Sequence, residues 1–260
     1  MYNQWPYSVD FISFNIPTIN IDLCYYYIPN PSNKAATQIQ LKPAQQPLFI
    51  NLHDNEKTSV QAALDCIQQH NYGHLLELSH KKNRLISLVI NNYSCQFDPN
   101  RIFTDTGIES TLKKYHCFSE NNFFIAKQFS EIILQQINTH NFSLLIALHN
   151  NEDKAGDNEN YNILSYYPHG DEAENTEDLY HNQAHCPDDF FITTERSLFN
   201  YIKNKKFNII LHKTTGVNDG SLSYYCALNK ISYINVEARH GHYHQQQQMI
   251  SLLFQYLESK

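Results

Sequence analysis

From about residue 47 onward, short apolar runs of strand length alternate with segments whose apolar residues recur at helical spacing. The strand-like runs lie at 48–52, 75–78, 85–90, 93–97, 144–148, 190–193, 208–211 and 231–236. The helical patterns lie at 58–67, 108–115, 123–137, 197–202, 222–228 and 245–257. This alternation predicts one α/β core domain, residues 46–260, with helices on both faces of a sheet.

Two segments interrupt the alternation. Residues 1–45 are rich in Tyr, Pro and Asn and show strand-like pieces at 11–16 and 19–21, so we expect an N-terminal extension that packs on the core. Residues 150–189 are polar and acidic with little periodicity, and a loop of this length is usually functional or disordered.

Charge and length exclude several classes of partner. Lys and Arg number 19 against 26 Asp and Glu, a net charge of −7, whereas a nucleic-acid partner requires clustered cations. No apolar run reaches the roughly 18 residues of a membrane-spanning helix, and residues 1–10 lack a secretory signal. We therefore expect no nucleic-acid or membrane partner and a cytoplasmic location. A periplasmic location stays open if a signal segment has been removed, and the oligomeric state is open.

The six cysteines form no C-x-x-C pair. Because a chain of 260 residues does not need disulfide staples, reduced and partly buried thiols are expected.

Three apolar runs end in side chains that can bind metal or transfer protons. The run 48–52 is followed by His53 and Glu56, the run 144–148 by His149, and the run 231–236 by Glu237. Catalytic zinc takes three nitrogen or oxygen ligands and keeps one position open for water. Since ligands of open α/β sheets gather at the carboxyl ends of strands, the sequence predicts a zinc site formed by His53, Glu56 and His149. Glu237 is the candidate general base.

Each of these residues also has an ordinary structural interpretation. A His-x-x-Glu pair often arises by chance, and Glu237 could be an ion-paired or capping carboxylate. The segment from Arg239 to His244 holds three histidines at alternate positions, a spacing that does not place them around one ion on a helix. We do not expect a second metal site there, although one of these histidines could support Glu237.

The combination of motifs resembles the zinc carboxypeptidase superfamily, including its aspartoacylase and succinylglutamate desuccinylase branch. The resemblance covers roughly residues 47–245 and rests on His53-x-x-Glu56, the later His149, the Asn100-Arg101 pair within 98–103, and the late Glu237. The segment 148–150 is similar to the aspartoacylase branch. The segments 220–225 and 233–237 are similar to the carboxypeptidases.

This resemblance implies a three-layer fold, a twisted and mostly parallel mixed sheet flanked by helices, with Zn²⁺ held by the three residues named above. It implies that Asn100 and Arg101 hold the substrate carboxylate, since a guanidinium matches a carboxylate bidentately. It gives Arg84 a role in stabilising the oxyanion. The mobile tyrosine of the carboxypeptidases has no counterpart at 213–217, so Tyr166, Tyr167 or Tyr180 is expected to cover the substrate.

The expected activity is therefore hydrolysis of an amide bond next to a free carboxylate. A metallocarboxypeptidase acting on a small peptide, for example a cell-wall peptide, is the first expectation. The alternatives are an aspartoacylase-like deacylase of N-acyl amino acids and a non-catalytic metal-binding relative.

Overall fold

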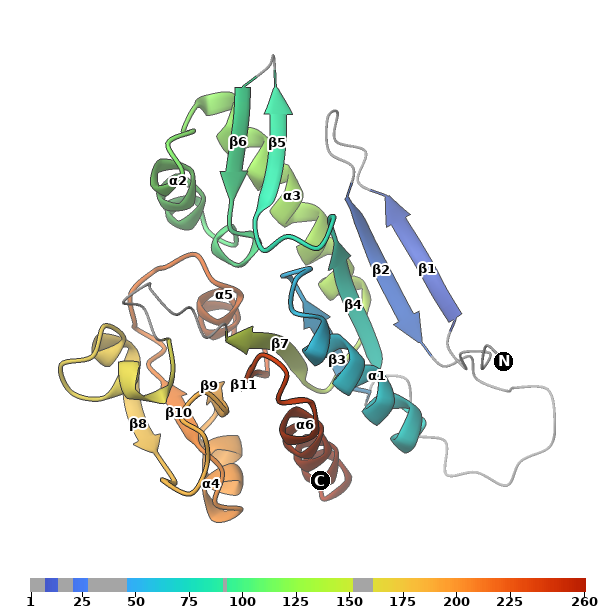
Figure 1. The fold of residues 1–260 in the computed structure, drawn as a ribbon, viewed down its shortest axis with the longest axis vertical. Helices are drawn as coiled ribbons and strands as arrows, with labels where there is room; N and C mark the ends of the chain where they lie inside the picture. Colours follow the sequence, from blue (N-terminus) through green and yellow to red (C-terminus); the bar gives the residue numbers. More distant parts are fainter. Residues whose placement is uncertain (1–7, 14–20, 28–45, 91–92, 152–160) are drawn as a thin grey trace.

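A nine-stranded sheet forms the centre of the part of the chain that the computed structural model describes, residues 8–13, 21–27, 46–90, 93–151 and 161–260 (Figure 1). The order across the sheet is β1-β2-β4-β3-β7-β11-β9-β10-β8. These strands are β1 Ser8–Ser13, β2 Asp22–Tyr27, β3 Leu48–Asn51, β4 His74–Ser79, β7 Leu145–Asn151, β8 Thr176–Tyr180, β9 Phe190–Thr193, β10 Ile209–His212 and β11 Tyr233–Arg239.

The described residues form six α-helices. They are α1 Lys57–His70, α2 Asp105–Lys114, α3 Glu120–Thr139, α4 Arg196–Asn204, α5 Leu222–Asn229 and α6 Tyr243–Glu258. Helices α1, α4 and α6 bury their apolar stripes in one core cluster, and α2, α3 and α5 contribute to another. Helices on both faces of a sheet that is parallel in its centre confirm the predicted three-layer α/β fold.

The sheet is mixed. β4, β3, β7 and β11 run parallel to one another, and β9 runs parallel to β10. Antiparallel pairs place β1 and β2 at one edge and β8 at the other, and also join β11 to β9. The carboxyl ends of β3, β7 and β11 therefore meet at one edge of the sheet, which is the arrangement that the site requires.

The described parts of residues 1–45 continue the sheet as β1 and β2, because β2 pairs with β4 along its whole length. The predicted strand at 19–21 is wrong where it can be compared, since Ile21 precedes β2, and residues 14–20 lie outside the described residues. A domain boundary at residue 45 stays a prediction.

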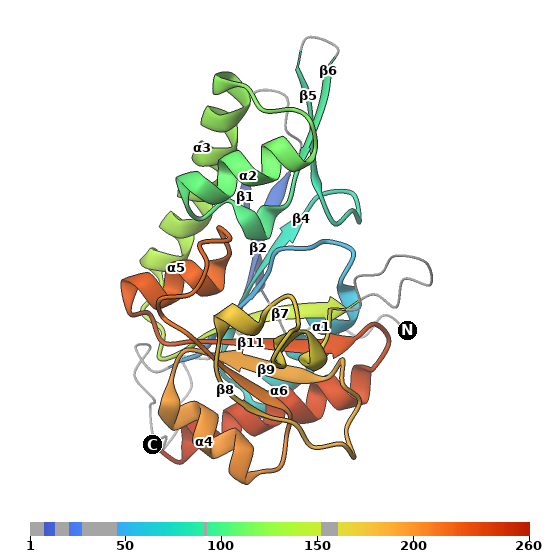
Figure 2. The ribbon, with the colours of Figure 1, turned by 90° about the vertical axis from the view of Figure 1, so that its left-hand side faces the viewer.

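A smaller unit stands over one end of the sheet (Figure 2). The strands β5 Ile86–Ile90 and β6 Tyr93–Phe97 form a separate antiparallel pair that contributes to the same core cluster as α2 and α3. A disulfide joins Cys95 to Cys117, with Cα atoms 5.3 Å apart. The expectation of reduced thiols is therefore wrong for this pair, because β6 and the segment after α2 lie side by side. It is correct for Cys24, Cys66, Cys186 and Cys226.

The segment 150–189 has more regular structure than its sequence predicts. It contains β8 and two short 3-10 turns, Ile163–Tyr166 and Ala173–Asn175, while residues 152–160 lie outside the described part. In the described residues, every helix is too short or too polar to cross a bilayer.

Candidate metal centre and active site

The turn after β3 delivers His53 and Glu56. The Asp54 carboxylate fixes this turn by accepting the backbone N–H groups of His80 and Lys82 at 2.6 and 2.7 Å. Glu56 is the N-cap residue of α1. Its carboxylate therefore lies at the positive end of a helix, which stabilises its charged form.

His149 lies inside β7, two residues before the end of the strand and directly after the apolar run that predicts it. Leu145 and Ala147 face one core cluster, while Ile146 and Leu148 face the other. Because side chains alternate along a strand, His149 shares the face of Leu145 and Ala147. β3 runs parallel to β7, so this position lies beside the turn that carries His53.

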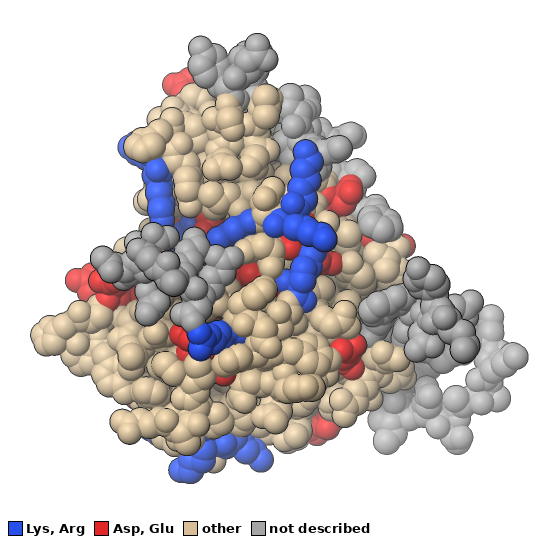
Figure 3. Space-filling model, viewed as in Figure 1, with Lys and Arg blue, Asp and Glu red and all other residues tan. Residues whose placement is uncertain are grey.

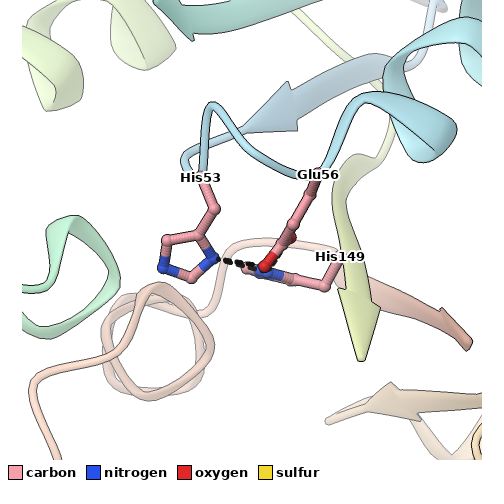
Figure 4. Close-up of side chains that lie close together, drawn as sticks. All are labelled: His53, Glu56 and His149. Atoms are coloured by element: carbon pink, nitrogen blue, oxygen red, sulfur yellow. Dashed lines mark hydrogen bonds and ion pairs between the residues drawn. The ribbon is translucent and has the colours of Figure 1, made fainter. Parts of the chain in front are cut away.

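The three predicted ligands converge on one point (Figure 4). The His53 Nδ1 lies 2.9 Å from the Glu56 Oε1 and 3.2 Å from the His149 Nδ1. The His149 Nδ1 lies 3.1 Å from the Glu56 Oε2. Ligands held about 2.0–2.1 Å from a tetrahedral zinc lie about 3.3–3.4 Å from one another. The three side chains are 1%, 1% and 6% exposed, so the donor set is preformed and removed from solvent.

The Asp98 carboxylate contacts the ring nitrogen of His53 that points away from the other two ligands. Its Oδ1 lies 2.9 Å from the His53 Nε2, so the ring nitrogen facing the ligand cluster is the Nδ1. Carboxylates commonly orient metal-binding histidines in this way and increase their basicity. Sequence reasoning missed this role, although Asp98 was within the motif that carried the resemblance.

The electrostatics of the cluster favour a cation. Burial alone would lower the pKa of His53, but Glu56 and Asp98 beside it raise that pKa to about 9. Burial opposes the charge on Glu56, yet His53 and His149 hold its pKa below the usual range of a carboxyl. The carboxylates of Glu56 and Asp98 thus keep a positive charge between them. The residues fit a divalent metal, which supplies that charge without a proton.

Two further polar residues, Asn150 and Gln246, hydrogen-bond to the ligand residues and hold them in position. The Asn150 backbone N–H donates to the Glu56 Oε2 at 3.1 Å, and its side-chain oxygen accepts the Ser59 N–H at 2.9 Å. The fully buried Gln246 donates to the carbonyl of His149 at 3.0 Å. One member of the glutamine run 245–248 therefore faces the site and not the solvent.

Glu237 lies beside His149 in the sheet. The two residues are register partners in the parallel pair of β11 and β7, and the alternation of both strands points them to the same face. Glu237 is 5% exposed, and the Asn235 Nδ2 donates to its Oε1 at 3.0 Å. Burial raises the pKa of Glu237, and the nearby Glu56 raises it further. A buried carboxylate with a raised pKa suits a general base that must later release its proton.

Arg84 precedes β5 and reaches back to the ligands. Its Nη1 donates to the Glu56 Oε1 at 2.5 Å, and its side chain is 41% exposed. Lys81 and Lys82 in the same loop are exposed as well. Figure 3 shows that several Lys and Arg side chains gather near the middle of the face it draws. The structure thus places Arg84 at the mouth of the cluster, where its oxyanion role stays a prediction.

Asn100 and Arg101 follow β6. The Asn100 Oδ1 accepts the Leu222 N–H at 3.1 Å and so holds the first residue of α5. Arg101 pairs with Asp219 at 3.3 Å, and the two side chains are 39% and 37% exposed. A guanidinium has five N–H donors, more than one carboxylate can use, so Arg101 can also bind a substrate carboxylate. Asp219 is a partner that the sequence did not indicate.

Two glycines bring these segments together. Gly107 lies at the start of α2, and Gly220 precedes α5 with a φ of +76°. A Cβ on Gly107 would lie only 2.2 Å from the Gly220 Cα. No larger residue fits at this contact, which positions Asp219 opposite Arg101.

The structure separates the tyrosines that were predicted to cover the substrate, Tyr166, Tyr167 and Tyr180. The last two contact His181 and the packing cluster around α4, respectively. Tyr166 is buried, and its hydroxyl hydrogen-bonds that of Tyr161. Both rings contact Phe190, which is the register partner of Glu237 in β9. Tyr166 therefore remains a candidate, together with Tyr161, which the sequence did not single out.

Solved structures similar to this chain include three proteins from Shewanella species. A Shewanella frigidimarina protein provisionally described as a succinylglutamate desuccinylase/aspartoacylase matches with a TM-score of 0.44 and 8% identity, over 98% of this chain and 72% of its own. A provisionally described metallopeptidase from Shewanella denitrificans matches with a TM-score of 0.41 and 10% identity, over 96% of this chain and 82% of its own. Another, from Shewanella amazonensis, matches with a TM-score of 0.39 and 9% identity, over 96% of this chain and 85% of its own. No family model and no curated protein matches the sequence.

Proposed function

We propose that the protein is a zinc-dependent hydrolase that cleaves an amide bond next to a free carboxylate. The observation that carries this proposal is the convergence of His53, Glu56 and His149 on one point, with Glu237 as the register partner of His149. Two histidines and one glutamate are a donor set used by catalytic zinc in hydrolases.

The reaction assigns a separate task to each remaining charged residue. Zinc bound by the three ligands would polarise the substrate carbonyl and lower the pKa of its water to about 7. Glu237 would take a proton from that water and pass it to the leaving amine. The Arg84 guanidinium would exchange its contact with Glu56 for the developing oxyanion once the metal neutralises that carboxylate.

The surroundings of the site favour an anionic substrate. Arg84 is partly exposed beside the ligand Glu56, and its loop also carries the exposed Lys81 and Lys82. Arg101 is accessible opposite Asp219. We propose a metallocarboxypeptidase whose peptide substrate, such as a cell-wall peptide, places its terminal carboxylate on Arg101. Deacylation of an N-acyl amino acid uses the same groups and is the alternative.

Elemental analysis of tag-free protein tests the metal first. Wild type is expected to hold one zinc at this site, and His53→Ala is expected to lose it. A panel of peptides with free or amidated C-termini and of N-acyl amino acids then tests the reaction. Cleavage only of peptides with a free C-terminus supports the carboxypeptidase, and cleavage of acyl amino acids supports the deacylase. Metal binding without turnover of any amide would indicate the non-catalytic relative.

The disulfide bears on the cellular location. Disulfides persist in oxidising compartments and are rare in the cytosol. The bond between Cys95 and Cys117 therefore favours the periplasmic alternative over the cytoplasmic one. Counting reactive thiols in denatured protein isolated without reductant would give four if the bond is present and six if it is not.

A further inference from the structure

A second cluster of metal-binding atoms lies outside the site described above. Among the described residues, ligand atoms of Cys186, Asp189 and His242 lie within 4.8 Å of one another. None of these residues belongs to the proposed hydrolase machinery. His242 comes from the histidine-rich segment in which the sequence suggested no second site.

The fold brings the three residues together from two segments. Asp189 immediately precedes β9, and a turn in which its N–H donates to the Cys186 carbonyl at 3.1 Å places the thiol nearby. β9 runs antiparallel to β11, so the start of β9 lies beside the end of β11. Gly241, with a φ of +85°, then turns the chain and places His242 at the N-cap of α6.

The carboxylate in this cluster is fixed and shielded. Asp189 is 5% exposed, and its Oδ1 accepts the Arg239 N–H at 2.9 Å. The His242 Nδ1 lies 3.2 and 3.0 Å from the two Asp189 oxygens. These distances are close to the separation of about 3.3 Å between ligands of a tetrahedral ion.

The cluster offers one sulfur, one nitrogen and one carboxylate. The Asp188 Oδ2 lies 3.6 Å from the Cys186 Sγ, outside this group of three. Thiolate and imidazole ligands select zinc and similar ions over magnesium and calcium.

We propose that Cys186, Asp189 and His242 bind a second divalent transition-metal ion, with zinc as the expected occupant. Binding releases the thiol proton to solvent and leaves the thiolate on the metal. The ion would join the start of β9 to the start of α6. Both lie near the end of β11, the strand that carries Glu237. The site does not depend on the proposed hydrolase function, because it shares no ligand with the first cluster.

Metal analysis of four tag-free proteins tests this site. We expect two equivalents of zinc in wild type, one in His53→Ala, one in Cys186→Ser and none in the double variant. His242→Gln provides a second test if the serine variant folds poorly. His240→Gln and His244→Gln are matched controls, because these exposed histidines of the same segment should leave two equivalents.

Cobalt substitution identifies the ligand directly. Co²⁺-loaded wild type and His53→Ala should show the near-ultraviolet charge-transfer band of a cobalt–thiolate bond, and Cys186→Ser should not. Equal metal content in wild type and Cys186→Ser, with no thiolate band, would overturn the proposal. Asp189 would then only hold the turn before α6 through its hydrogen bonds with Arg239 and His242. If only the hydrolase site is wrong, His53→Ala would match wild type while Cys186→Ser still loses one equivalent.

Discussion

Two pairs of histidines in this protein lie in opposite electrostatic surroundings. His53 and His149 approach within 3.2 Å, with Glu56 between them and Asp98 behind. His74 and His140 lie near the other end of the sheet, with ring centroids 6.3 Å apart, and both stack with Tyr25. Among the described residues, no carboxylate pairs with either ring of the second pair.

The pKa values of His53, in the first pair, and His74, in the second, move in opposite directions. Carboxylates overcome burial and raise the pKa of His53 to about 9, whereas burial and the neighbouring His140 lower the pKa of His74 to about 4. Proximity of two histidines therefore does not make a metal site. Neighbouring carboxylates decide whether a histidine pair attracts a cation or stays neutral.

Loss of the metal bound by His53, Glu56 and His149 should have the largest effect. A substitution in the second histidine pair should not cause this loss. His149→Ala or a chelator is expected to abolish hydrolysis, because the reaction needs the metal. A metal present at about 1,000 times its dissociation constant stabilises a fold by about 4 kcal/mol, so the melting temperature should fall by about 10 °C. His140→Ala is the matched control and should keep both metal and activity. Equal metal loss in the two variants would remove the distinction between the pairs.

Glu237→Gln should separate catalysis from metal binding. Glutamine keeps the size of the side chain but cannot take a proton, so kcat should fall by about 10²–10⁴-fold. Zinc content should be unchanged, because Glu237 is not one of the three ligands. The exposed Glu174 offers a control, Glu174→Gln, with wild-type kcat. A Glu237→Gln enzyme with full activity would assign the proton transfer to another group.

The contrast between local and distant contacts explains how much of the site the sequence predicted. The turn with His53 and Glu56, and the strands that carry His149 and Glu237, depend on short apolar runs that the chain displays directly. The sheet edge then follows from general properties of parallel strands. The fold class was predicted for the same reason.

Other features depend on which distant segments become neighbours. Asp98 lies 45 residues from its partner His53 in sequence. Cys186 and Asp189 are close in sequence, but only the pairing of β9 with β11 brings them to His242. The disulfide and the pair of Arg101 with Asp219 have the same origin. No local pattern distinguishes Gln246 from the other glutamines of its run, although it alone faces His149 closely enough to donate to its carbonyl.

Asp98→Asn should have an intermediate effect on the first pair. The substitution preserves shape but removes the charge that supports His53, and outer carboxylates of this kind contribute about 10–100-fold to metal affinity. Zinc competition with a chromophoric chelator should show this loss, while Asp105→Asn, a change at an exposed aspartate paired with Lys127, should not. An unchanged affinity would mean that Glu56 alone sets the charge at this pair.

His74→Gln should have the smallest effect, visible only through pH. The pKa of His74 is about 4 in the folded protein and about 6.5 in the unfolded chain, so the unfolded chain takes up the proton first. The stabilising contribution of the neutral ring is therefore complete above pH 6.5 and is lost as the pH falls toward 4. Because part of the ring is exposed, we expect a loss of about 1–2 kcal/mol.

Denaturant unfolding of wild type and His74→Gln at pH 7.5 and pH 4.5 measures this contribution. The free-energy difference between the two proteins should shrink at the lower pH, since metal release affects both alike. His244→Gln, at an exposed helical position, should show no such change. A constant difference would mean that folding does not lower the pKa of His74.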